Sequence, residues 1–323
     1  MVVIFHCGAQ VLRVGHPFNE SEWLASGVDI FFVISGFIMW VSTANRPKIR
    51  PVDFWKRRVR RIVPLYWLVT SFTVAVLVLT PSVVKTGSFE LWHVVTSFLF
   101  VPSTHPVTGL MQPVVIPGWS LNFEMFFYFI FGGCLFLPLH IRLAALVAVL
   151  GSLVMTGLVL NPQNPTAAFY TSPLVAEFAL GAVLGWRVVK GGQVNRYAAV
   201  LMLVLGALLL PMPSAIKYIN TITASILIVA GVVFLDMLGL VRFQRLPHLL
   251  GDASYSIYIT HAMIVSAFGQ LWQRLGLFEM PFAVPLYVGC AFSVAIFSGV
   301  IVYRLIELPI LGSRAKVSPS EVK

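Results

Sequence analysis

Charged side chains are scarce in this sequence of 323 residues: only 11% of them are Asp, Glu, Lys or Arg. A soluble domain carries roughly 25%. Hydrophobic residues make up 58% instead, and the mean hydropathy is +0.89. A water-soluble protein must still cover its surface with polar groups, so this composition excludes a soluble enzyme and a disordered chain.

Cysteine is also rare, with three residues in the chain. Cys7, Cys134 and Cys290 lie in apolar runs, without the spacing of a disulfide framework or of a metal site. A disulfide-rich secreted module is therefore excluded, and we predict no bound metal; the cysteines are expected to be small core residues. The chain also begins without the basic segment of a cleavable signal peptide.

Long apolar runs are what the sequence does contain. They extend for 16 to 24 residues, whereas the strands of a membrane barrel alternate between apolar and polar residues. We therefore predict an all-α protein, a polytopic transmembrane helical bundle of about ten spans. The expected spans are 1–12, 28–44, 62–80, 119–138, 141–160, 171–189, 196–211, 217–235, 250–272 and 283–304. The shorter run 91–101 is expected to be re-entrant or interfacial, and we assign 1–311 to one membrane domain and 312–323 to a short cytoplasmic tail.

The basic residues predict the orientation of these spans. Segment 45–61 alone holds eight Lys and Arg, and cytoplasmic loops are the ones enriched in basic residues. With this segment inside, 18 of the 22 Lys and Arg fall on the cytoplasmic side, and only Arg13, Lys85, Lys217 and Arg274 fall outside. Both termini are then cytoplasmic, and we expect a multi-pass protein of the inner (plasma) membrane.

Ionisable residues within spans are costly and are therefore functional candidates. In the predicted topology His6, Asp29, Glu124 and Glu177 lie in the outer half of the membrane on four different helices, and His261 lies near mid-depth. Each has a structural alternative. His6 and Glu124 can serve as hydrogen-bonding residues between helices, Asp29 can cap its helix, and for Glu177 and His261 we favour a structural role.

A basic segment at 53–66 opens the third expected span. Arg58 and Arg61 are three residues apart and therefore lie on one helical face. Paired guanidinium groups bind phosphates well, which would suit a phosphate-bearing cytoplasmic ligand. The alternative is an anchor to anionic lipid, a common role of basic clusters beside a membrane span.

Five stretches together carry a resemblance to a known family. They are VIFH at 3–6, GVDIFFVISGF at 27–37, R-x-x-R-I-x-P-x-Y at 58–66, W-S-L-x-x-E-x-x-F-Y at 119–128 and S-Y-S-I-Y-I-x-H at 254–261. Each is weak alone, but their order and predicted depths resemble the membrane acyltransferase-3 family, specifically its exopolysaccharide-modifying branch.

The resemblance implies transfer of an acyl group, usually acetyl from acetyl-CoA, to a hydroxyl of a surface polysaccharide or of its lipid-linked precursor. His6 matches the essential histidine of the family, and Glu124 matches its glutamate. Arg58 and Arg61 match an arginine pair associated with the acyl-CoA side. The resemblance thus implies acyl-CoA as donor substrate and a saccharide as acceptor, with no nucleic acid.

Two departures from the family pattern accompany these matches. The family carries Arg or Lys eleven residues before its histidine, and no residue precedes Met1 here. We therefore expect the reading frame to continue upstream with a basic residue at that place; the alternative is that the 323-residue form is real and partly impaired. The sequence also lacks the extra hydrolase-like domain of some members, which leaves the modified glycan open.

The expected mechanism places coenzyme A between the arginine pair and the histidine. Arg58 and Arg61 would hold its phosphates, and its flexible arm would reach toward His6. Histidine titrates near neutrality, so His6 can accept a proton from the attacking hydroxyl or carry the acyl group itself. Glu124 or Asp29 would orient its ring.

The alternative class is a transporter or flippase without chemistry. Charged groups within spans also suit a proton-coupled pathway. Against this alternative, the sequence shows no inverted repeat and no matched pair of broken helices.

Overall fold

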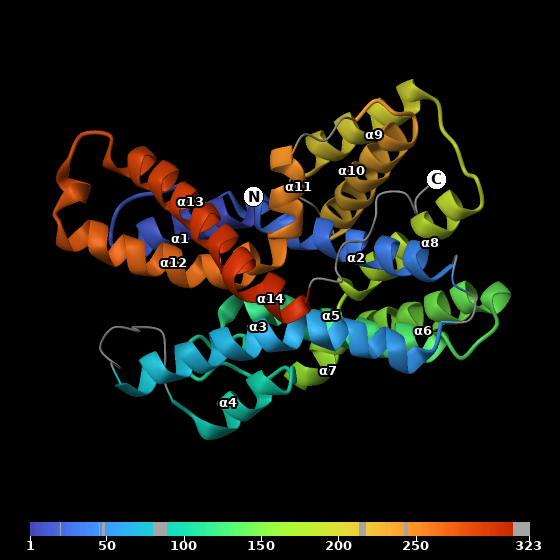
Figure 1. Cartoon of the computed structure of the whole chain (residues 1–323), viewed down its shortest axis with the longest axis horizontal. Coiled ribbons are helices and arrows are strands. Elements are labelled where there is room, and N and C mark those ends of the chain that lie inside the picture. Colours follow the sequence, from blue (N-terminus) through green and yellow to red (C-terminus); the bar gives the residue numbers. More distant parts are fainter. Residues whose placement is uncertain are drawn as a thin grey trace.

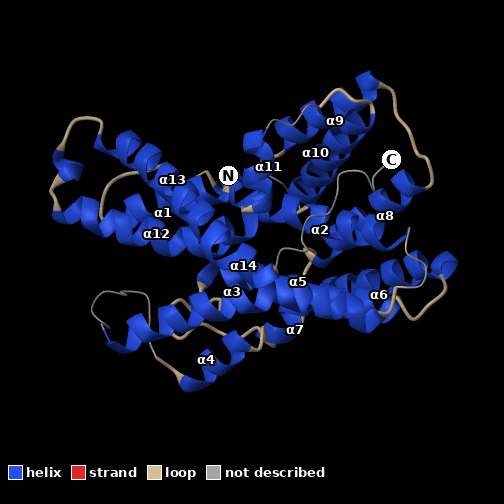
Figure 2. Ribbon diagram, in the orientation of Figure 1, coloured by secondary structure: helices blue, strands red, loops and turns tan. Residues whose placement is uncertain are grey.

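The computed structural model describes residues 1–19, 21–44, 46, 49–79, 89–212, 218–241 and 245–312. Within these ranges the chain is helical, and only an isolated bridge between Thr104 and Met111 has β geometry (Figure 2). The predicted all-α class is therefore confirmed.

Fourteen α-helices form in the described ranges, and each of the ten expected spans overlaps at least one of them. Short 3₁₀ turns at Glu22–Ser26, Ile116–Gly118 and Leu277–Glu279 and a π turn at Tyr303–Glu307 join or extend them. The helices are α1 (Val2–Arg13), α2 (Gly27–Ala44), α3 (Pro51–Leu79), α4 (Leu91–Phe98), α5 (Trp119–Cys134), α6 (Leu139–Leu160), α7 (Pro165–Tyr170), α8 (Val175–Val189), α9 (Arg196–Leu209), α10 (Ile219–Met237), α11 (Arg245–Asp252), α12 (Ser254–Arg274), α13 (Ala283–Val302) and α14 (Leu308–Leu311).

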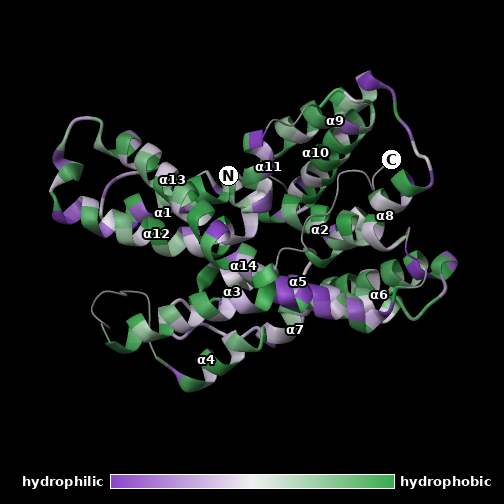
Figure 3. Cartoon of the chain, viewed as in Figure 1, coloured by the Kyte–Doolittle hydropathy of each residue, from purple (hydrophilic) through white to green (hydrophobic). Residues whose placement is uncertain are grey.

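Six of the described helical segments are long and apolar enough to cross a membrane. Their mean hydropathy lies between 1.4 and 2.5, and hydrophobic residues predominate along them (Figure 3). Many of these apolar side chains are exposed. They are Glu22–Ala44, Pro51–Leu79, Leu139–Leu160, Pro165–Val189, Ile219–Met237 and Ala283–Leu311. The apolar helices α1 and α9 are shorter. A multi-pass membrane protein is thus supported, whereas the count of ten spans and the cytoplasmic placement of both termini stay predictions; most of the expected tail lies outside the described residues.

The helices pack in groups around two main cores (Figure 1). Helices α2, α3, α5 and α8 share the larger core, in which Phe32, Tyr66, Phe127 and Phe178 are almost fully buried. Helices α1, α12 and α13 form a second group around the buried Tyr287. Figure 1 places this second group beside α3, and α12 contacts α3 directly.

Helices α2 and α8 make the closest packing contact through two glycines. A Cβ added to Gly36 would overlap the backbone carbonyl of Phe178, and one added to Gly181 would overlap that of Val33. Small residues of this kind let helix backbones approach in an apolar medium, where there is little hydrophobic force to drive helices together. This crossing fixes α2, and with it Asp29, against α8.

We predict that Gly181→Ala destabilises the protein by about 1–3 kcal/mol, because the new methyl group overpacks the crossing. The matched control is Gly151→Ala on α6, where a Cβ would meet no atom within 4 Å. Thermal unfolding of both purified variants in detergent measures the effect. Equal melting temperatures for the two variants would contradict a tight α2–α8 contact.

Candidate active site

Two histidines from different helices meet where α1 packs on α12. The rings of His6 and His261 lie edge to face, with their centroids 4.8 Å apart. His261 is completely buried, and its Nδ1 lies 2.5 Å from the carbonyl oxygen of Tyr258. A carbonyl oxygen only accepts hydrogen bonds, so this contact assigns the His261 proton to Nδ1. Its Nε2 is then an unprotonated, buried nitrogen, and it has no hydrogen-bond partner among the described residues.

His6 also lines a cavity of about 680 Å³. Helices α1 and α12 run in the same direction along it, since His6 meets His261 and Gln10 packs against Gly269. The lining is mixed apolar and polar. Its polar members are His6, Gln10, Arg13, Thr73, Thr108, Gln112, Ser266, Gln270, Gln273 and Arg274. Hydroxyl, amide and guanidinium groups beside an imidazole are suited to binding a hydroxyl-rich ligand.

The segment between α4 and α5 forms one wall of this cavity and is held by a second histidine pair. The rings of His93 and His105 are 5.0 Å apart, and the Nδ1 of His105 accepts the backbone N–H groups of Val107 and Thr108. Burial, with a smaller contribution from His105, lowers the pKa of His93 to about 4. Burial also lowers the pKa of His105, and its Nδ1, as an acceptor, holds the turn that places Thr108 in the cavity wall.

Hydroxyl groups connect the cavity wall to the histidines. The Tyr258 hydroxyl lies 2.7 Å from Ser120 Oγ and donates to the carbonyl of Pro117 at 3.0 Å. Tyr258 precedes His261 by less than one helical turn, and its carbonyl is the group that binds the His261 ring. One turn earlier, Tyr255 donates to the carbonyl of Ile62 on α3 at 2.6 Å.

The groups His261, Tyr258 and Tyr255 form a row along α12 that leads to α3. The arginine pair of α3 lies at the end of this row, near Glu124. The guanidinium of Arg58 is 5.6 Å from the ring centroids of both Phe54 and Tyr128. The Tyr128 hydroxyl donates to Glu124, which interacts electrostatically with both Arg58 and Arg61. Arg58 is half-buried and its Nε has no hydrogen-bond partner among the described residues, whereas Arg61 is exposed. The pair thus offers unsatisfied donors next to the protein interior.

The remaining candidate, Asp29, belongs to a different contact. Its side chain interacts with Glu177 of α8, which is completely buried. Neither carboxylate oxygen of Glu177 has a hydrogen-bond partner among the described residues, so the contact between the two carboxyl groups is electrostatic. The described interactions of Asp29 do not include His6.

The candidates therefore form a row and not one cluster. The described ring neighbours of His6 are Phe5 and His261, while Glu124 lies with the arginine pair and Asp29 with Glu177. From Tyr255, whose hydroxyl reaches the backbone beside Arg61, His261 is six residues or about 9 Å further along α12. A role of Glu124 or Asp29 in orienting His6 stays a prediction, and it would have to act through intervening groups.

Three residues near His6 were not predicted as site residues from the sequence: His261, Tyr258 and Gln10. His261 and Tyr258 stand three apart within the 254–261 stretch, so helical spacing already placed them on one face. Gln10 likewise follows His6 by four residues. The sequence did not indicate that this face of α12 packs against the face of α1 that carries His6 and Gln10.

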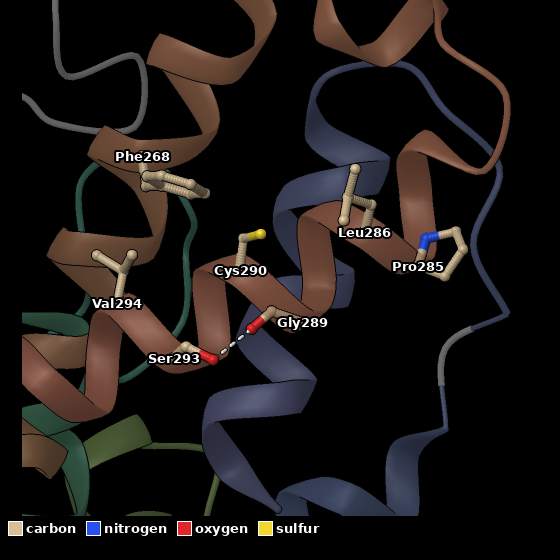
Figure 4. A pocket seen from close by; sticks show the side chains of 7 residues that line it. All are labelled: Phe268, Pro285, Leu286, Gly289, Cys290, Ser293 and Val294. Carbon is tan, nitrogen blue, oxygen red and sulfur yellow. Dashed lines mark hydrogen bonds between the residues drawn. The ribbon is translucent and has the colours of Figure 1, made fainter.

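A second depression lies on the surface between α12 and α13 (Figure 4) and measures about 450 Å³. It is mostly apolar, and its one hydroxyl, on Ser293, already donates to the carbonyl of Gly289 at 2.8 Å. It is lined by Phe268, Pro285, Leu286, Gly289, Cys290, Ser293 and Val294. Its chemistry does not make it a candidate site.

Among the described residues, no group of three or more His, Cys, Asp or Glu is placed to hold a metal ion.

These features define a membrane protein in which a buried histidine, His261, meets a half-buried one, His6, beside a cavity of mixed polarity. The chain belongs to the acyltransferase-3 family: the family profile, described as an acyltransferase domain, matches residues 1–304. The exopolysaccharide production protein ExoZ of Rhizobium meliloti is 37% identical over 320 residues, which are 96% of this chain and 94% of ExoZ. The O-acetyltransferase OatA of Staphylococcus aureus is 28% identical over 207 residues, which are 57% of this chain and 32% of OatA. No solved structure matches the chain. The predicted family is thus confirmed.

We predict that Glu124→Gln lowers acyl-transfer turnover at least about tenfold, equivalent to about 1.4 kcal/mol in the barrier. Gln keeps the size of the side chain and accepts from Tyr128, but it removes the negative charge that faces the arginine pair. The control is Glu279→Gln, a change at an exposed position. A Glu124→Gln protein with normal turnover and a reduced melting temperature would make Glu124 a packing residue.

Proposed function

We propose that this protein is an integral-membrane O-acyltransferase of the inner (plasma) membrane. It transfers an acyl group, most simply acetyl, from acyl-CoA to a hydroxyl of a surface polysaccharide or of its lipid-linked precursor. The observation that carries the proposal is the row of groups from Arg58 and Arg61, through Tyr255 and Tyr258, to His6 at the cavity. The names of ExoZ and OatA support a polysaccharide acceptor and acetyl as the group.

The arginine pair is the proposed binding site for the phosphates of coenzyme A. Guanidinium groups form charge-assisted, often bidentate hydrogen bonds with phosphate oxygens. Arg58 rests on two aromatic rings, which restrict its rotamers and direct its donors before the ligand arrives. Glu124 is the nearby counter-charge, so the pair is not an isolated positive charge in an apolar medium.

The proposed chemistry takes place at His6. In the direct route His6 accepts the proton of the acceptor hydroxyl while its oxygen attacks the thioester carbonyl. The carbon–oxygen bond forms, the carbon–sulfur bond breaks, and the proton passes from His6 to the leaving thiolate of coenzyme A. In the covalent route a ring nitrogen of His6 attacks the thioester carbonyl, the carbon–sulfur bond breaks and the thiolate of coenzyme A leaves. The acceptor hydroxyl then attacks the acyl carbon, the bond to His6 breaks, and the hydroxyl proton passes to the thiolate. In both routes the unprotonated Nε2 of His261 is the basic group beside the His6 ring while that ring is positive.

We predict that His6→Ala lowers acyl transfer by about 10²–10⁴-fold, the usual contribution of a general base. The measurement is release of free coenzyme A from acetyl-CoA by purified protein in nanodiscs, in the presence of the cell's polysaccharide fraction. His140→Ala, which alters an exposed histidine, is the control and should keep wild-type activity. Normal turnover in a folded His6→Ala protein would refute the assignment, and a transporter without chemistry would release no coenzyme A even as wild type.

We predict that replacing both Arg58 and Arg61 by Ala weakens coenzyme A binding at least about tenfold, since two charge-assisted contacts are lost. The matched control replaces Arg57 and Arg60, which have the same spacing on the same helix but are both exposed. Calorimetry with coenzyme A compares the two double variants. An anchor to anionic lipid predicts equal effects from both pairs on membrane insertion and unchanged affinity for coenzyme A.

A further inference from the structure

Two arginines stand at the far end of the cavity from the histidine pair. Arg13 is the last residue of α1 and Arg274 the last residue of α12, and both line the cavity. Gln10 of α1 contacts Gly269 of α12. Arg13 follows Gln10 by three residues, and Arg274 follows Gly269 by five. At 1.5 Å per residue these positions are about 4.5 and 7.5 Å along the two parallel helices, so the arginines lie at nearly the same depth.

This end of the cavity is positively charged. No Asp or Glu is found among the described residues that line the cavity. Arg13 donates a hydrogen bond to the neutral Oε1 of Gln10 at 3.3 Å, and neither guanidinium has a carboxylate partner within the described ranges. Two cations facing one cavity without counter-charge raise the local concentration of anions.

The charge distribution of the whole chain makes these arginines unusual. Only four of the 22 Lys and Arg fall outside in the predicted topology, and both of those that the structure describes line this cavity. A general role exists for such residues, since a cation near a helix C-terminus is favoured by the helix dipole. That role requires neither that the two arginines share a cavity nor that carboxylates be excluded from its lining.

We propose that the acceptor is an anionic saccharide, and that Arg13 and Arg274 bind its phosphate or carboxylate while a hydroxyl further along the molecule reaches His6. The proposal rests on the proposed acyl transfer and specifies its acceptor. Arg13 is seven residues from His6, or about 10 Å along α1. The acylated hydroxyl is therefore about one or two sugar units away from the anionic group.

The test measures binding of three glycolipids to the full chain in nanodiscs of neutral lipid. Octyl glucoside is neutral, octyl glucuronide carries a carboxylate, and farnesyl diphosphoglucose carries a diphosphate. We expect at least one anionic probe to bind the wild type at least about tenfold more tightly than octyl glucoside, and Arg13→Gln with Arg274→Gln to abolish that difference. Preference for one anionic probe identifies whether the acceptor charge is a lipid-linked diphosphate or a carboxylate of the glycan.

The controls separate charge from folding. Lys190→Gln removes an exposed cation after α8, outside the cavity, and should bind all probes as wild type does. Arg13→Lys with Arg274→Lys retains the charges and should restore part of the preference. Equal affinity of the wild type for all three probes, or an undiminished preference in the Gln variant, overturns the proposal.

The same samples separate this proposal from the proposed function. If wild-type protein releases no coenzyme A from acetyl-CoA with any acceptor but still prefers anionic probes through Arg13 and Arg274, the acyl transfer is wrong and the anion site stands. If it acylates octyl glucoside as well as the anionic probes and binds them equally, the acyl transfer stands and the anion site is wrong.

Discussion

The cost of a polar group in an apolar surrounding is the constraint on which the rest of this structure depends. Three ionisable groups of the site each have a partner that reduces this cost. His261 binds a carbonyl of its own helix, Glu124 accepts from a tyrosine one turn away, and Arg58 rests on two aromatic rings. Because most of these partners lie on the same helix or on the helix next to it, the candidate site is built from short, local contacts.

Much of the helical pattern follows from the sequence, because the length and hydropathy of an apolar run depend only on local composition. All ten expected spans overlap helices, and the run at 91–101 does contain a helix, α4, too short to cross a membrane. The sequence did not predict which faces of these helices pack against each other. The position of Glu124 beside the arginines is set by how α5 lies on α3, where Trp55 donates to the carbonyl of Tyr128 at 2.9 Å and fills the space above Gly132. No periodicity in either helix specifies that contact.

The same limit explains Asp29. From its place near the start of a span, Asp29 was predicted either to cap its own helix or to orient His6. Neither prediction involved helix α8. The structure pairs it with Glu177 instead, because the glycines of α2 and α8 bring these two helices together more closely than their hydropathy indicates. Packing by small residues thus decides which carboxylates meet.

Pro117 belongs to two parts of the molecule at once. It lines the cavity, and its carbonyl accepts the hydroxyl of Tyr258, the residue whose own carbonyl holds the proton of His261. A ligand that displaces this wall would therefore change the hydrogen bonds that lead from Pro117 through Tyr258 to His261. Thermodynamic linkage then requires the reverse effect of equal size: a change of protonation at the histidines alters the affinity of the cavity for its ligand. One coupling free energy therefore describes both how ligand binding in the cavity changes the proton affinity of the histidines and how their protonation changes ligand binding.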